Sequence, residues 1–187
     1  MRPVAKSVMF VLAALPAGGC ARPAATVETA AEASAAPVIL ADERGIVLGQ
    51  RARSQSMTIK ASPVAAWRVA KRVYEALSIP VTHENPTAHQ IGNKDFWKTR
   101  SVGPLRMAEV VDCGVGATGR KADYYRIYMT LVTTIGAHAG GGTLLQTTLI
   151  AFGQDVSGGN ADRIPCGSSG ILESLINESI RDNSVGK

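Results

Sequence analysis

The feature that most constrains the fold of this 187-residue chain is a long segment, residues 123–134, in which apolar side chains alternate with more polar ones. An alternation with a period of two predicts a strand with one apolar face. That face would carry Tyr125, Ile127, Met129 and Leu131. Residues 143–152 predict the returning strand of an antiparallel pair, after a glycine-rich, mobile connection at residues 135–142. Because one face of this sheet is apolar, another element has to cover it.

Two segments have the amphipathic pattern of helices that can provide this cover. The first is predicted to begin after Ser62, a good N-cap residue, with Pro63 in its first turn. Trp67 and Tyr74 flank its apolar stripe, where we favour a role as core anchors over a binding platform. The stripe consists of Ala66, Val69, Ala70, Val73 and Leu77.

The second helix is predicted near the end of the chain, capped by Ser168 or Ser169. Its apolar stripe consists of Ile171, Leu172, Leu175, Ile176 and Ile180. Its solvent face would carry Glu173, Ser174, Asn177 and Glu178. We expect the stripe to close the core against strand residues Ile127, Met129, Leu131, Leu145 and Leu149. With a strand at residues 56–61, the element order predicts an α+β two-layer sandwich, in which an early helix and a C-terminal helix pack on one face of an antiparallel sheet.

The middle of the chain predicts shorter elements. Residues 81–84 and 89–93 predict a hairpin, and residues 106–113 predict a strand. Residues 94–105 are typical of a crossing loop or an irregular strand. Phe96 and Trp97 in this segment are candidate contacts for a partner, or else both are tucked under the edge of the sheet.

Three glycines, Gly114, Gly116 and Gly119, have the spacing of a dinucleotide-binding GxGxxG motif. That motif requires a helix N-terminus after the glycines, whereas residues 123–134 predict a strand. We therefore expect a flexible hairpin loop here rather than a phosphate cradle.

The N-terminal twenty residues, MRPVAKSVMFVLAALPAGGC, have the features of an export signal: Arg2 and Lys6, then an apolar run too short to span a bilayer, then small residues before Cys20. They resemble the lipobox signal of bacterial lipoproteins, with Ala17 where that family usually has Leu. The resemblance implies removal of residues 1–19 and lipidation of Cys20, for example with palmitate. The residue after Cys20 is Ala21 and not an acidic residue. In this it resembles lipoproteins that are sent to the outer membrane, in bacteria that have one. Residues 20–53 would form a flexible tether and lead-in, and residues 54–187 a single folded domain.

Two cysteines, Cys113 and Cys166, remain once Cys20 is assigned to the lipid anchor. An even pair in an oxidising compartment predicts a disulfide, with Cys166 at the start of the last helix. A metal site or a catalytic thiol is the alternative, although neither cysteine has a CxxC partner or a nearby histidine.

The charge of the chain predicts no nucleic-acid partner. The net charge of +5 falls to +3 once Arg2 and Lys6 leave with the signal, and no run of Lys or Arg is present. His83, His89 and Glu84 would meet across the predicted hairpin as a metal site, but surface turn histidines are favoured. We predict no catalytic residue, no metal and no cofactor.

Three functions agree with these features. The first is a non-catalytic envelope lipoprotein, anchored to the membrane by its lipid, whose domain binds other envelope proteins or scaffolds an assembly. The second is a carrier or sensor of a small apolar ligand held between the sheet and the C-terminal helix, and the third is a hydrolase. The element order resembles the helix-grip domains of envelope lipoproteins such as the BamC component of outer-membrane assembly, and this resemblance favours the first function.

Overall fold

The computed structural model describes residues 41–42, 45–46, 53–157 and 162–184. The predicted signal, the predicted lipidation site Cys20 and most of the predicted tether lie outside the described residues. The first described elements, β1 (Ala41–Asp42) and β2 (Gly45–Ile46), pair with each other as antiparallel strands. No helix within the described ranges is long and apolar enough to cross a membrane.

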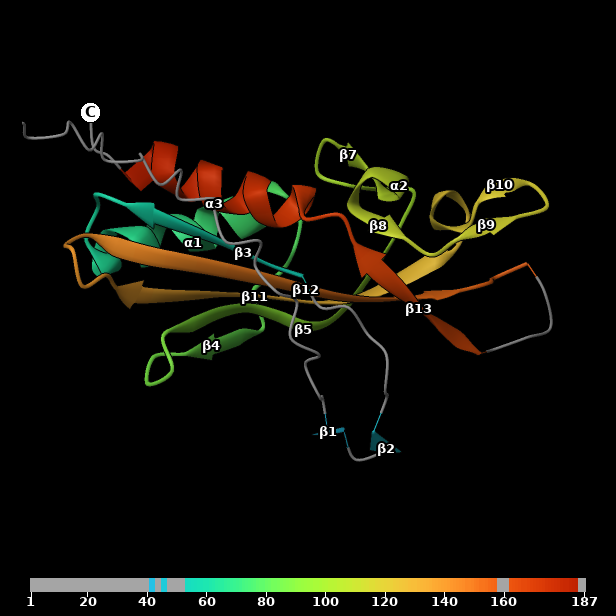
Figure 1. Cartoon of the computed structure of the whole chain (residues 1–187), viewed down its shortest axis with the longest axis horizontal. Helices are drawn as coiled ribbons and strands as arrows, with labels where there is room; N and C mark the ends of the chain where they lie inside the picture. Colours follow the sequence, from blue (N-terminus) through green and yellow to red (C-terminus); the bar gives the residue numbers. More distant parts are fainter. Residues whose placement is uncertain (1–40, 43–44, 47–52, 158–161, 185–187) are drawn as a thin grey trace, which may run out of the picture. The chain divides into compact units, whose positions relative to one another are not determined.

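The sheet is built around two long antiparallel strands, β11 (Arg126–Ala137) and β12 (Thr143–Gln154), which pair over their full lengths. The other edge of β11 pairs with β5 (Gln90–Thr99), which continues to the edge strand β4 (His83–Asn85). The other edge of β12 is shared: its first half pairs with β3 (Arg53–Ile59) and its second half with β13 (Arg163–Ser168). Two strands from opposite ends of the domain therefore lie end to end along β12 (Figure 1).

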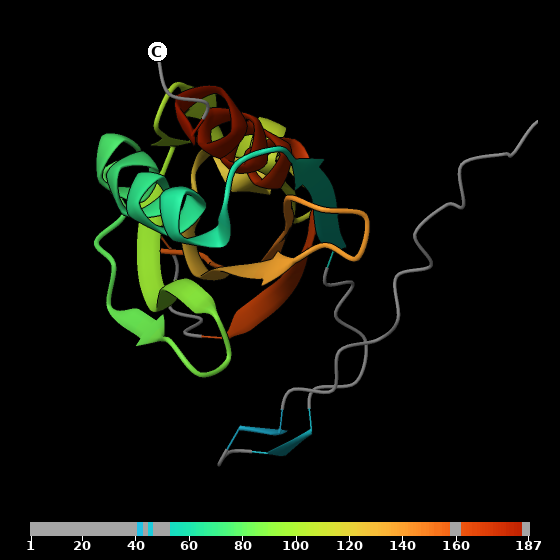
Figure 2. The ribbon, with the colours of Figure 1, turned by 90° about the vertical axis from the view of Figure 1, so that its left-hand side faces the viewer.

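Two helices cover one face of this sheet, α1 (Pro63–Ala76) and α3 (Ile171–Ser184), and they lie side by side (Figure 2). The hydroxyl of Ser62 accepts a hydrogen bond from the Ala65 N–H, as expected for the N-cap of α1. The predicted stripe of α1 is buried, Tyr74 is fully buried, and Trp67 packs partly buried against the core. The predicted strand residues Ile127, Met129 and Leu131 are also buried. The α+β fold with an early helix and a C-terminal helix is confirmed.

The segment at residues 106–113 is not a strand. It contains β7 (Leu105–Arg106), the helical turn α2 (Met107–Val110) and the short strand β8 (Val111–Asp112). Glu109 stabilises the helical turn because its carboxylate accepts a hydrogen bond from the Arg106 N–H at 2.8 Å. Met107 and Val110, three residues apart, are both fully buried, which is the spacing of a helix and not of a strand.

Residues 94–105, expected to be a crossing loop or an irregular strand, are mostly strand, and the connection predicted at residues 135–142 is shorter than expected. Strand β5 continues through Thr99, with a bulge opposite Thr130, and a small hairpin of β6 (Ser101–Val102) with β7 follows it. The connection between β11 and β12 is only residues 138–142, because both strands extend further than the sequence pattern indicated. The segment with Gly114, Gly116 and Gly119 forms a hairpin, in which β9 (Val115–Gly116) pairs with β10 (Gly119–Arg120). This hairpin leads into the short 3-10 helix η1 (Lys121–Asp123).

Helix α3 is rotated relative to its predicted orientation. Leu172, Ile176 and Ile180 are buried as expected and Leu175 is partly buried, but Ile171 is 46% exposed. Glu173 and Asn177, which we placed in solvent, are buried instead. The reason is that each finds polar partners in the interior, so that its burial does not leave all of its polar atoms unpaired.

A chain of hydrogen bonds crosses this interior from one helix to the other. The Thr147 hydroxyl donates to Asn177 Oδ1 at 2.7 Å, so its oxygen accepts from Thr133 at 2.8 Å, and Thr133 in turn accepts from the Tyr74 hydroxyl at 3.0 Å. The Asn177 amide then donates to the Gln55 carbonyl at 2.9 Å. These hydrogen bonds join five elements: α1, β11, β12, α3 and β3. Burial raises the pKa of the Tyr74 hydroxyl at one end of the series.

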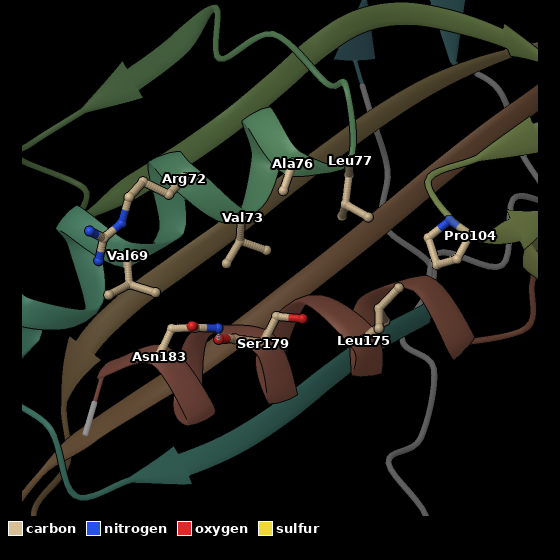
Figure 3. Close-up of a pocket in the computed structure, with 9 residues that line it drawn as sticks. All are labelled: Val69, Arg72, Val73, Ala76, Leu77, Pro104, Leu175, Ser179 and Asn183. Carbon is tan, nitrogen blue, oxygen red and sulfur yellow. Dashed lines mark hydrogen bonds between the residues drawn. The ribbon is translucent and has the colours of Figure 1, made fainter. Parts of the chain in front are cut away.

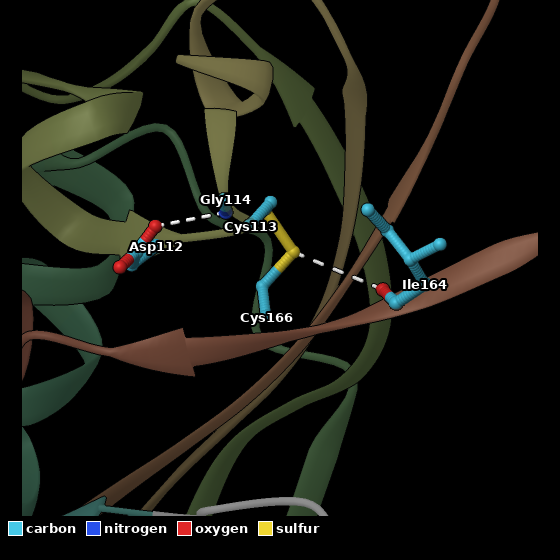
Figure 4. Close-up of a disulfide and its surroundings, with 5 residues drawn as sticks. All are labelled: Asp112, Cys113, Gly114, Ile164 and Cys166. Carbon is cyan, nitrogen blue, oxygen red and sulfur yellow. Dashed lines mark hydrogen bonds between the residues drawn. A yellow bond between two sulfur atoms is a disulfide. The ribbon is translucent and has the colours of Figure 1, made fainter. Parts of the chain in front are cut away.

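Cys113 and Cys166 form a disulfide, as predicted, with their Cα atoms 4.3 Å apart (Figure 4). Cys166 lies within β13 and not at the start of the last helix, so the bond ties β13 to the segment that follows β8. Gly153 on β12 makes room for it: an added Cβ there would lie 3.2 and 3.3 Å from the two sulfur atoms.

Candidate interaction surface

The face of the sheet opposite to the helices carries a row of ring-bearing side chains. In the strand register, Trp97 lies opposite Tyr128, Tyr128 opposite Phe152, and Phe152 opposite Pro165. Residues directly opposite each other project from the same face of a sheet. The row therefore crosses β5, β11, β12 and β13. Trp97 is 53% exposed, Pro165 is exposed, and Tyr128 and Phe152 are half-buried.

Two arginines lie against this row. In the adjacent register row, Arg126 lies opposite Gln154, and Gln154 lies opposite Arg163. The Arg126 guanidinium stacks over the Trp97 ring at 4.6 Å from the ring centroid, and that of Arg163 over the Tyr128 ring at 3.5 Å. These are cation–π contacts, which restrain both guanidinium groups on the sheet. We call this set the outer-face cluster: Trp97, Arg126, Tyr128, Phe152, Arg163 and Pro165.

The electrostatics of the outer-face cluster centre on Tyr128. Its hydroxyl donates to Gln154 Oε1 at 2.8 Å. Hydrogen bonding with Arg126, together with the positive charges of Arg126 and Arg163, lowers the pKa of the Tyr128 hydroxyl. The arrangement offers flat apolar surfaces for stacking and charged N–H donors beside them, which is chemistry suited to recognition.

The structure separates the two aromatic residues that we predicted as contacts. Trp97 belongs to the outer-face cluster, whereas Phe96 is 7% exposed and packs in the core, where it lies opposite Met129. The remaining members of the cluster were not predicted from the sequence. The available signal was that Arg126 and Tyr128 occupy the polar face of the long alternating segment, where smaller polar residues would serve as well.

A cleft of about 650 Å³ lies between α1 and α3 (Figure 3). Six of its nine described lining residues are apolar, and the polar side chains of Arg72 and Asn183 lie toward one end. The lining residues are Val69, Arg72, Val73, Ala76, Leu77, Pro104, Leu175, Ser179 and Asn183.

The histidines do not form the metal site considered above. Glu84 pairs with Lys71 at 2.8 Å, and His83 Nε2 lies 3.4 Å from Gln90 Oε1. Within residues 53–157 and 162–184, no group of three or more His, Cys, Asp or Glu side chains is arranged to hold a metal ion.

One buried carboxylate remains incompletely paired. Glu173 Oε1 accepts a hydrogen bond from the Ser168 hydroxyl at 2.6 Å, but Oε2 is buried without a partner. Burial raises the pKa of the Glu173 carboxyl, and the Ser168 hydrogen bond opposes that shift only in part.

The comparisons with known proteins leave the resemblances to bacterial lipoproteins and to helix-grip domains as predictions from the sequence. No protein-family model matches this chain, and no curated protein or solved structure matches it significantly.

Proposed function

We propose that this protein is a membrane-anchored envelope lipoprotein with a non-catalytic domain, and that the domain binds a protein partner through the outer-face cluster. The observation that carries this proposal is the stacking of two arginines on two aromatic rings, on the sheet face that α1 and α3 leave uncovered. Tryptophan, tyrosine and arginine are the residues most enriched at the energetic centres of protein interfaces.

The position of the cluster on β5, β11, β12 and β13 supports this proposal further. These strands are held by paired backbones, so the rings and guanidinium groups are already ordered before a partner arrives. Less conformational entropy is then lost on binding. The predicted lipid at Cys20 and the tether up to residue 53 would present the domain to partners near the same membrane.

The test compares Trp97→Ala with Leu144→Ala. Leu144 is 36% exposed, lies on the same face near the other end of β12, and is outside the outer-face cluster. Partners cross-linked to the wild-type protein in intact envelope are identified by mass spectrometry, and the purified pair is titrated. We expect Trp97→Ala to weaken binding by about 30-fold, the effect of a 2 kcal/mol hot spot, and Leu144→Ala to leave it unchanged. Equal affinities for the wild type and Trp97→Ala would exclude this surface.

The carrier function remains the second candidate, because a cleft of suitable size exists. Its position is between the two helices rather than between the sheet and α3 as we expected. The hydrolase hypothesis gains no supporting feature from the described residues.

A further inference from the structure

The cleft between α1 and α3 has a polarity that changes along its length. Arg72 and Asn183 lie toward one end, whereas Leu77, Pro104 and Leu175 lie toward the other (Figure 3). A volume of about 650 Å³ is within the usual range of ligand-binding pockets. An elongated ligand that fits this cleft would therefore have one polar end and one apolar end.

The charge at the polar end of the cleft comes from Arg72, which is the one ionisable residue among the described residues that line it. In the part of the chain that the structure describes, no ion pair or hydrogen bond to its guanidinium is present. The adjacent Lys71, by contrast, is paired with Glu84. A guanidinium in this position has free N–H groups that match a carboxylate, sulfate or phosphate.

A second hollow of about 330 Å³ extends the apolar end. It shares Leu175 with the cleft, and Leu105, next to Pro104 in sequence, contributes to its lining together with Ile171. Glu178 also lines this hollow. The Arg53 guanidinium lies beside this hollow but donates to the Ser169 carbonyl at 2.9 Å, whereas Arg72 has no such partner among the described residues. A negatively charged head group is therefore favoured at Arg72 and disfavoured near Glu178.

We propose that the α1–α3 cleft binds an anionic amphiphile, a single-chain molecule with a negative head group such as a fatty acid. The head group pairs with Arg72, and the hydrocarbon chain lies over Val73, Leu77 and Leu175. A neutral apolar ligand would leave the guanidinium unused. The site lies on the helices and does not involve the outer-face cluster, so this proposal is independent of partner binding there; it specifies the ligand class of the carrier candidate.

The test uses the full chain with Cys20→Ser, purified without detergent, and titrates dodecanoate and its uncharged counterpart dodecanol below their aggregation limits. The Arg72→Gln variant is compared with Arg68→Gln, because Arg68 is exposed on the same helix but does not line the cleft. Ala76→Trp is the third variant, in which a large side chain on an exposed wall residue fills the cleft. Circular dichroism confirms that each variant is folded.

We expect Arg72→Gln to weaken dodecanoate binding by about tenfold or more and dodecanol binding little, since only the charged head contacts the guanidinium. Ala76→Trp should weaken both ligands, and Arg68→Gln neither. Equal losses in Arg72→Gln and Arg68→Gln would show unspecific attraction and overturn the proposal. It would also be overturned if dodecanoate did not bind at millimolar concentration, or if the cleft mediated self-association that Ala76→Trp abolished.

Discussion

The same strands carry different kinds of side chain on the two faces of the sheet. On β11, Ile127, Met129 and Leu131 point into the core, while Arg126 and Tyr128 point to the outer face. On the inner side, the polar groups of the hydrogen-bond chain from Tyr74 to Gln55 find partners within the protein. On the outer face, the guanidinium groups of Arg126 and Arg163 lie over the rings of Trp97 and Tyr128. We therefore expect substitutions on the inner face to change stability strongly, and substitutions on the outer face to change it little.

The largest expected effect on stability comes from removal of the disulfide. Its Cys166 lies in β13, directly after Pro165 of the outer-face cluster. Replacing both Cys113 and Cys166 with Ser should reduce the free energy of unfolding by about 4 kcal/mol, the chain-entropy value for a loop of this length, in which the cysteines are 53 residues apart. Urea unfolding of the oxidised wild type and the double variant measures the difference. A change below about 1 kcal/mol would mean that the bond is not needed to hold β13 in place.

Helix α3 allows a matched comparison within the inner face. Ile176→Ala should reduce the free energy of unfolding by about 2 to 5 kcal/mol, because Ile176 is fully buried. From the sequence, Leu175→Ala is predicted to reduce the free energy of unfolding by the same amount. In the structure the Leu175 side chain is only partly buried, at the cleft, so we expect a smaller reduction. Denaturant midpoints measure both, and the reverse order would contradict the orientation of α3.

Glu173 predicts how stability depends on pH. Its pKa is raised in the folded state above the ordinary value of 4.5, so the folded protein favours the protonated form. The stabilising contribution is fully present below pH 4.5 and is lost as the pH rises through the folded-state pKa. Glu173→Gln should therefore become progressively more stable than the wild type as the pH increases above 4.5. Thermal unfolding over a pH series measures this, and a constant difference would exclude ionisation as the cause.

The smallest effect on stability is expected on the outer face. Trp97→Ala removes the cation–π contact with Arg126 at an exposed site, which should reduce the free energy of unfolding by less than about 1 kcal/mol. Urea unfolding provides the value. A loss comparable to that of Ile176→Ala would break the separation between the two faces, because Trp97 would then be a core residue.

Local patterns in the sequence predicted much of the fold because they depend on neighbouring residues only. Alternation identified the buried face of β11, and the Ser62-Pro63 pair marked the start of α1. The orientation of α3 was beyond such patterns. Asn177 is buried because Thr147 and Gln55, both distant in sequence, supply its hydrogen-bond partners.

The outer-face cluster was predictable only at Trp97. Its other members come together through the register of four strands, in which Trp97 aligns with Tyr128, Phe152 and Pro165. A shift of one residue between two strands would send these side chains to opposite faces. That register is set by strand pairing between residues distant in sequence, such as Gln90 and Thr134, which no local pattern contains.

The end-to-end placement of β3 and β13 on β12 has a mechanical consequence. Tension transmitted along the chain from residue 52 would act first on Arg53, whose backbone pairs with Leu149 near the middle of β12. The Arg53 guanidinium also donates to the Ser169 carbonyl at 2.9 Å, just before α3. A pull on the N-terminal end of β3 would therefore have to break this hydrogen bond to the segment before α3, as well as the backbone pairing with β12.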